Sequence, residues 1–101
     1  MRVLVFFDLP VKTMEQRRAY TKFRKLLIKN GFMMLQESVY CKMVQNSNAV
    51  ESVQSLIHKN HPEEGLVQLL TVTERQYQKM DFIVGEAKNE LLDTDERLVI
   101  F

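Results

Sequence analysis

The sequence predicts an α+β fold, and three observations support this prediction. Residues 3–7 and 66–73 are largely apolar runs, which are typical of strands in the interior of a sheet. Residues 13–30 and 49–60 repeat apolar side chains at helical spacing. Two short apolar segments lie between the helices, which gives the order strand, helix, strand, strand, helix, strand. This order is typical of a ferredoxin-like βαββαβ domain, in which two helices cover one face of an antiparallel sheet.

The first predicted strand ends in a carboxylate. Val3 to Phe7 are all apolar, and Pro10 stops the run because proline cannot donate a hydrogen bond to a neighbouring strand. Asp8 therefore stands at the exit of a buried strand, where desolvation penalises a charge unless it is paired or holds a metal ion. Two interpretations are open at this point: Asp8 is a metal ligand, or it caps the turn or helix that follows.

The first predicted helix is apolar on one side and basic on the other. Thr13 is its expected N-cap, the helix runs to about Asn30, and Gly31 suits the position after its end. The apolar arc contains Ala19, Tyr20, Phe23, Leu26 and Leu27. The opposite arc contains Arg17, Arg18, Lys22, Arg24, Lys25 and Lys29. Seven of the 14 basic residues lie between Lys12 and Lys29, which indicates a phosphate-facing surface or a plain solvated face.

The middle of the chain supplies the remaining elements. Residues 32–35 and 38–44 are expected to form two short strands with a tight reversal between them. A turn and cap cluster at 46–48 precedes the second helix, which begins at Ala49 and ends near Asn60. Pro62 sets this limit because it disfavours helix in the residue before it.

Residues 1–101 are expected to form one domain, of which 80–101 is a C-terminal extension that takes part in dimer or partner pairing. Residues 74–79 suggest a helical turn and 80–84 a short strand. A polar, acidic connector then leads to a terminal strand with the sequence Arg97, Leu98, Val99, Ile100 and Phe101. Such a strand is suited to pair with an exposed sheet edge, its own or a neighbour's.

Composition excludes several classes of site. Residues 1–62 carry 10 Lys and Arg against 4 Asp and Glu, whereas residues 63–101 carry 4 against 9. This division suits a polyanion on one half and a basic protein on the other, or two solvated faces. Cys41 is the only cysteine, so the chain offers no zinc set, and a reducing cytoplasm is the expected location. No membrane-spanning segment, phosphate-binding glycine loop or nucleophilic triad is recognisable, and His58 and His61 are expected at the surface.

The second face of the predicted sheet has no helix to cover it. The first strand is apolar on both faces, so a second copy of the chain is the simplest cover, and a homodimer is expected. A two-fold axis can bring two Asp8 carboxylates together and give one Mg²⁺ two ligands. Such an ion would activate a water for phosphodiester cleavage beside Arg17 and Arg18. The alternative is a scaffold without catalytic activity, in which the two nearby carboxylates are a structural feature.

Four features together resemble the family of small CRISPR-associated adaptation proteins, described as endoribonucleases, that partner the adaptation integrase. They are the strand ending in Asp8, the basic helix with Arg17-Arg18 and residues 23–27, the start of the third strand at 36–40, and the terminal strand at 96–101. They span essentially the whole chain. Residues 69–74 are similar to the version found beside single-protein RNA-guided effector nucleases.

The resemblance implies a ferredoxin-like homodimer in which Asp8 is the catalytic residue and the magnesium ligand. Some members cut single-stranded RNA or double-stranded DNA with a metal ion. In spacer acquisition the dimer bridges integrase dimers and lies along the protospacer duplex. The residues implied at its backbone are Arg17, Arg18, Arg24 and Lys25, and the terminal strand is implied in integrase docking. Many members have tyrosine before the aspartate, where this chain has Phe7.

Three hypotheses follow from these observations. The first is a non-catalytic scaffold that binds duplex backbone and docks the integrase. The second is a magnesium-dependent nuclease centred on Asp8. The third is a βαββαβ nucleic-acid-binding module outside CRISPR adaptation, which the sequence favours less because the predicted third strand offers only Tyr40 for base stacking.

Overall fold

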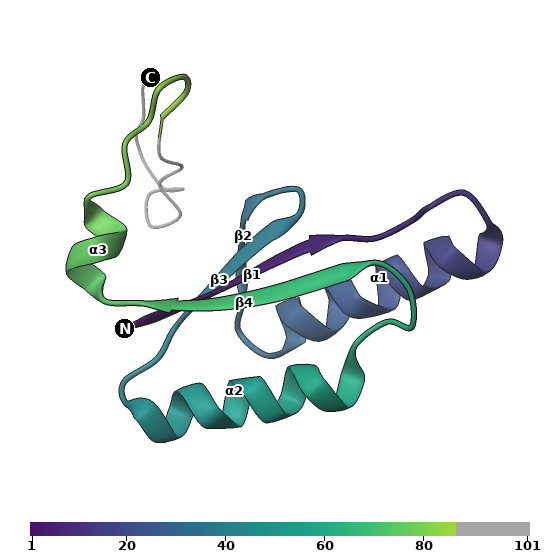
Figure 1. The fold of residues 1–101 in the computed structure, drawn as a ribbon, viewed down its shortest axis with the longest axis horizontal. Helices are drawn as coiled ribbons and strands as arrows, with labels where there is room; N and C mark the ends of the chain where they lie inside the picture. The colour runs from purple at the N-terminus through teal and green to yellow at the C-terminus, as the bar shows by residue number, and fades with distance from the viewer. Residues whose placement is uncertain (87–101) are drawn as a thin grey trace.

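A four-stranded antiparallel sheet with the order β2-β3-β1-β4 lies at the centre of the computed structural model, which describes residues 1–86 (Figure 1). The elements in chain order are β1 (Arg2–Asp8), α1 (Met14–Lys29), β2 (Met33–Gln36), β3 (Val39–Met43), α2 (Ser47–Asn60), β4 (Leu66–Val72) and α3 (Glu74–Gln78). This order and topology confirm the predicted α+β, ferredoxin-like arrangement. The predicted terminal strand, Arg97–Phe101, lies outside the described residues.

Strand β1 occupies a central position and is paired on both sides. Leu4 faces Cys41 of β3 and Leu70 of β4, and Asp8 at the end of the strand faces Leu66. Val3 and Val5 are fully buried. The continuous apolar run is therefore explained by a strand that has neighbours on both edges and side chains packed on both faces.

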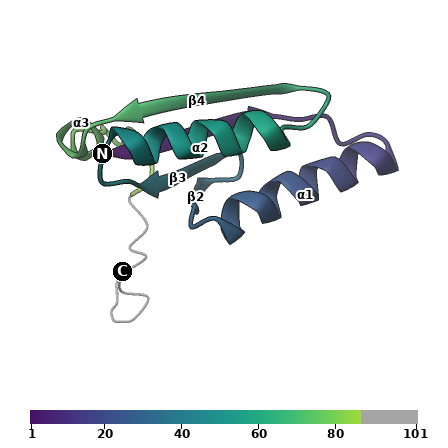
Figure 2. The ribbon, with the colours of Figure 1, turned by 90° about the horizontal axis from the view of Figure 1, so that it is seen from below.

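Both α1 and α2 lie on the same side of the sheet (Figures 1 and 2). The core forms between them and the sheet, and Phe7 lies at its aromatic centre. The Phe7 ring lies 5.4 to 5.9 Å from the rings of Tyr20, Phe23 and Tyr40, measured between centroids. The apolar arc predicted for the first helix points into this core, because Phe23 and Leu27 are buried and Tyr20 and Leu26 pack against the same cluster.

The ends of the helices follow from local hydrogen bonds. Thr13 caps α1, and its side chain and that of Gln16 each bond the other's backbone N–H. Gly31 follows α1 with φ of +91°, as predicted for the residue after the helix. Asn46 caps α2 through a bond to Ala49 N, so α2 begins two residues earlier than expected.

The short strand predicted at 80–84 is wrong. Residues 80–84 form no strand, and Phe82, Ile83 and Val84 are 47%, 83% and 91% exposed. Apolar composition alone does not form a strand, because backbone groups in a sheet need a neighbouring strand to bond. Within the described part of the chain no strand lies beside this segment.

Candidate nucleic-acid and metal site

Asp8 is an exposed carboxylate at the end of the central strand. Val3, Val5 and Phe7 belong to the core under the helices, so by strand alternation Asp8 points to the opposite face, here called the open face. Its carboxylate forms no hydrogen bond or ion pair with any described residue. The interpretation that Asp8 caps the following turn or helix is wrong, because its side chain forms no hydrogen bond with a described residue and Thr13 is the N-cap of α1.

Gly65 lies against the backbone of Asp8. The sequence predicted a turn at this position but not its contact with Asp8. The φ of Gly65 is +94°, and a Cβ atom there would lie 2.6 Å from the Asp8 carbonyl oxygen and 2.9 Å from the Leu9 side chain. Only glycine allows the turn before β4 to pass so close to the end of β1. The backbone that carries the exposed carboxylate is therefore closely packed against the turn before β4.

The described residues of one chain offer few grouped ligands for a metal ion. Among residues 1–86, no group of three or more His, Cys, Asp or Glu side chains is placed to hold one. Mg²⁺ accepts as few as one or two carboxylates when waters and phosphates complete its shell. Asp8 fits this requirement because it is exposed and its carboxylate forms no hydrogen bond or ion pair with a described residue.

The predicted basic residues of α1 divide into two pairs. The guanidinium of Arg17 donates to the carbonyl oxygens of Val11 and Lys12 at 3.1 and 3.0 Å. Arg24 Nε donates to the hydroxyl of the fully buried Tyr40 at 2.9 Å. Both arginines thus have bonds within the fold, one to the loop before α1 and one to β3.

Arg18 and Lys25 lie on another strip of the same helix. Together with Lys22 and Lys29 they follow spacings of four, three and four residues, which place all of them on one side of α1. None of the four forms a hydrogen bond or ion pair with a described residue. We call this set (Arg18, Lys22, Lys25, Lys29) the α1 basic stripe. Lys22 and Lys29 were not among the predicted nucleic-acid-binding residues, although their helical spacing could be seen in the sequence.

Two hollows lined by described residues of α1 differ in charge. Near the start of the helix, Glu15, Glu63 and Glu64 line a hollow of about 150 Å³ together with Leu9 and Pro10. Toward the other end, a hollow of about 180 Å³ is lined by Lys22, Lys25, Leu26, Lys29 and Asn60. A polyanion is repelled by the first and attracted by the second. The electrostatics of α1 therefore favour phosphate contact along the middle and end of the helix.

The open face carries exposed apolar side chains. Strand pairing places Met43, Met33, Leu66 and Leu70 on this face, because residues paired across strands point to the same side. These four side chains are between 42% and 62% exposed. The prediction that apolar side chains also occupy the second face of the sheet is confirmed, and Asp8 lies at its edge opposite Leu66.

Phe7 differs from Asp8 in orientation as well as chemistry. It is 4% exposed and packs under the helices, whereas Asp8 points to the open face. Position 7 therefore contributes to the core, and the missing hydroxyl leaves the surface around Asp8 unchanged.

Comparison with known proteins identifies the family. The family described as CRISPR associated protein Cas2 matches residues 1–80. The chain belongs to the Cas2 family. A Treponema denticola protein named CRISPR-associated endoribonuclease Cas2 is 60% identical over 100 residues, which are 99% of each chain. A protein of the same name from Streptococcus mutans serotype c is 42% identical over 99 residues, covering 98% of this chain and 91% of that one.

A solved Cas2 structure shares the fold. The crystal structure of Streptococcus pyogenes Cas2 at pH 6.5 has a TM-score of 0.61 and 20% sequence identity, covering 83% of this chain and all of that one. The family match and the similar relatives confirm the resemblance inferred from the sequence, and they favour CRISPR systems over a nucleic-acid-binding module outside them. No helix among residues 1–86 combines the length and apolar character needed to cross a bilayer.

Proposed function

We propose that this chain acts in CRISPR spacer acquisition as a homodimeric scaffold that binds protospacer DNA and bridges integrase dimers. The observation that carries the proposal is the separation of two surfaces across one sheet. The apolar open face is on one side, and the helices, with the α1 basic stripe, are on the other. Two copies packed through their open faces would bury the apolar side chains and turn both stripes outward.

The outward stripes suit the sugar-phosphate backbone of a duplex. Arg18 and Lys29 are separated by 11 positions, which is about 16 Å along a helix at 1.5 Å per residue. Each strand of a duplex presents a phosphate about every 3.4 Å along the axis, so the stripe can neutralise several phosphates without reading bases. The expected binding is strong at low salt and indifferent to sequence.

A test of the scaffold uses one paired variant and its control. Lys22→Ala/Lys25→Ala removes two cations of the stripe, and Arg75→Ala/Lys79→Ala removes two cations from the α3 region. The stripe variant should weaken duplex binding similarly for all sequences and make the salt dependence shallower by about two charges. Equal effects of the two variants, or a loss confined to one sequence, would refute the backbone-binding proposal.

Residues 82–84 of the C-terminal extension support a role in docking a partner protein. Phe82, Ile83 and Val84 expose apolar side chains on backbone that pairs with no described strand. Such a segment can add to a sheet edge of another chain. We propose that residues 80–101, including Arg97–Phe101, pair with the second copy and with the integrase.

The cytoplasm is the proposed site of action. Cys41 is buried and is the only cysteine of the sequence, so the chain has no internal disulfide, as expected in a reducing compartment.

A magnesium-dependent endonuclease is the second candidate, and the unpaired Asp8 carboxylate favours it. Relatives named as endoribonucleases support RNA as a substrate, and duplex DNA is the alternative. Bound Mg²⁺ would supply a Lewis acid and a water of lowered pKa. Asp8 would hold the ion, and Gly65 would keep the carboxylate in place.

Asp8→Ala separates the two candidates. Nuclease activity with Mg²⁺ is measured on RNA and on duplex DNA, and spacer integration is measured in cells. Loss of cleavage with intact integration assigns the scaffold as the biological role. Loss of both assigns chemistry to that role, and no cleavage by the wild-type protein in any metal or pH series refutes the nuclease.

A further inference from the structure

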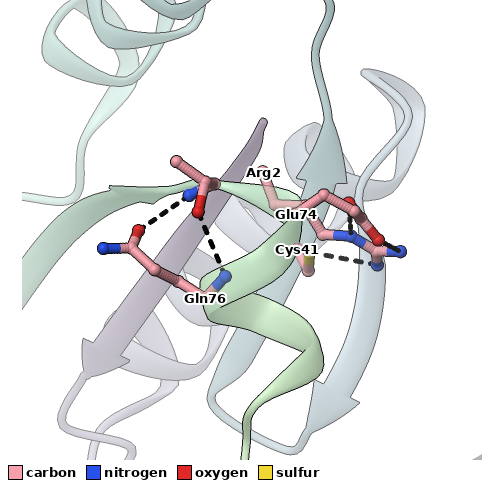
Figure 3. Close-up of polar contacts among 5 residues, drawn as sticks. Arg2, Cys41, Glu74 and Gln76 are labelled. Atoms are coloured by element: carbon pink, nitrogen blue, oxygen red, sulfur yellow. Dashed lines mark hydrogen bonds and ion pairs between the residues drawn. The ribbon is translucent and has the colours of Figure 1, made fainter.

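A cluster of interacting side chains lies at the start of β1, at the end of the strand opposite Asp8 (Figure 3). Arg2 Nε and Nη2 donate to the two carboxylate oxygens of Glu74 at 2.9 and 3.0 Å. Arg2 Nη1 lies 3.9 Å from Sγ of Cys41, and the guanidinium carbon lies 3.9 Å from the centre of the Tyr77 ring. One arginine therefore contacts both β3 and α3.

The contact is more specific than an ordinary surface ion pair. The Arg2 side chain is 15% exposed, and its planar fork meets the carboxylate with two parallel bonds. The aromatic face of Tyr77 adds a cation–π interaction on the same guanidinium. Glu74 and Tyr77 are three residues apart, so they share one side of α3.

Helix α3 depends on outside contacts for its position. It has five residues and none of them is buried, whereas isolated helices shorter than about 12 residues are marginal in water. Thr73 and Gln76 form a capping box that closes its first turn (Figure 3). The capping box stabilises the turn itself, and the bonds from Arg2 to Glu74 join α3 to β1 of the sheet.

The Arg2 contact places α3 at one end of the open face. Arg2 alternates with the core residue Val3, and it faces Met43, which is exposed on the open face. Figure 1 shows α3 beside the N-terminus, with the segment that follows leaving from this end of the sheet. The orientation of α3 thus determines the direction in which Phe82, Ile83 and Val84 leave the domain.

We propose that Arg2 is a positioning residue for assembly: it seats α3 on the margin of the open face so that residues 82–84 meet a second copy of the chain. The occupant is a second copy because Arg2 is paired with Met43, whose exposed side chain belongs to the apolar open face that the proposed dimer buries. This inference rests on the proposed homodimer.

The test compares two arginine-to-lysine changes. Arg2→Lys keeps the charge but loses the fork and the flat contact with Tyr77, whereas Arg75→Lys makes the same change on an α3 arginine with no side-chain bond to the described residues. Amide hydrogen exchange reports on α3, and light scattering with a dilution series reports on dimerisation. Arg2→Lys should raise exchange at residues 76–80 about two- to fivefold and weaken the dimer by a similar factor, and Arg75→Lys should change neither.

Two further variants keep the outcomes distinguishable. Glu74→Gln changes the other side of the Arg2–Glu74 contact and should have the same effect as Arg2→Lys. Leu70→Glu places a charge on the open face and leaves the Arg2–Glu74 contact in place. If Leu70→Glu separates the copies while Arg2→Lys loosens α3 without weakening the dimer, the positioning role is overturned and the proposed dimer stands. Unchanged exchange in Arg2→Lys also overturns it. A wild-type chain that is monomeric overturns both proposals.

Discussion

The two ends of β1 carry opposite charges, and only one of these charges is bonded to another described side chain. Arg2 is mostly buried and its guanidinium is bonded to Glu74, whereas Asp8 is exposed and its carboxylate has no partner among the described residues. They are separated by six positions, about 20 Å of extended strand. The Arg2 end is completed by the chain's own side chains, and the Asp8 end leaves a charge available for a ligand.

The same distinction divides the basic residues of α1. Arg17 and Arg24 are bonded to the fold, while the α1 basic stripe has no such bonds among residues 1–86. Position on a helical wheel alone does not show which cation is available. The contacts of each side chain decide whether its charge stabilises the domain or binds a partner.

The largest expected effect is at Asp8, whose carboxylate has no partner among the described residues. Asp8→Asn should leave the free energy of unfolding nearly unchanged, because the carboxylate forms no hydrogen bond or ion pair with a described residue. It should lower any Mg²⁺-dependent cleavage about a hundredfold or more, because the amide is a poor magnesium ligand. Cleavage rates at saturating Mg²⁺ and a denaturant melt check the two halves, and a large loss of stability would contradict an unpartnered carboxylate.

A smaller effect is expected where Gly65 meets the Asp8 backbone. Gly65→Ala should lower the free energy of unfolding by about 1–3 kcal/mol, because alanine is strained at φ of +94° and its Cβ would clash with the Asp8 carbonyl. Gly85→Ala is the matched control, since Gly85 has φ of +90° with no atom within 4 Å of its Cβ position. Equal losses in urea unfolding would show that contact with Asp8 contributes nothing.

The division of the α1 cations predicts a further contrast. Arg24→Ala removes the partner of a buried hydroxyl and should cost about 1–3 kcal/mol of stability. Lys25→Ala, one residue later, should leave stability within about 0.5 kcal/mol and reduce duplex affinity. Thermal melts and a binding titration in the same buffer measure both, and the reverse pattern would show that the stripe was assigned to the wrong residues.

The smallest effect is a pH dependence at the Arg2 end. The hydrogen bond from Arg2 lowers the pKa of Glu74 and raises the pKa of Arg2 itself. The contribution of the contact is therefore fully present above the ordinary carboxyl pKa of 4.5 and is lost as the pH falls through the lowered pKa. The NMR signals of the Tyr77 ring should be constant from pH 7 to 5 and shift below that range. Glu74→Gln should abolish the shift.

The sequence was sufficient for local features. The continuous apolar run of β1, the Thr13 cap and the helical repeat around Phe23 and Leu27 follow from rules that act over a few residues, and each prediction was confirmed. The apolar character of the open face was also visible, because residues 3–7 of the first strand contain no polar side chain.

Features that join distant residues could not be predicted in the same way. Arg2 and Glu74 are 72 positions apart, and Arg24 reaches Tyr40 on another element. Nothing in the local pattern distinguishes these arginines from unbonded ones. The strand predicted at 80–84 failed for the related reason that pairing needs a neighbour, which composition does not supply.

The distance between equivalent positions in two copies tests the central claim most directly. Spin labels are placed at Asp8→Cys in one sample and at Arg18→Cys in another; native Cys41 is fully buried, which leaves the introduced cysteine as the labelling site. The account predicts a dimer in which the labels at position 8 are closer together than those at position 18, because the open faces meet and the basic stripes face outward. Closer labels at position 18, or no dipolar coupling from either position, would contradict it.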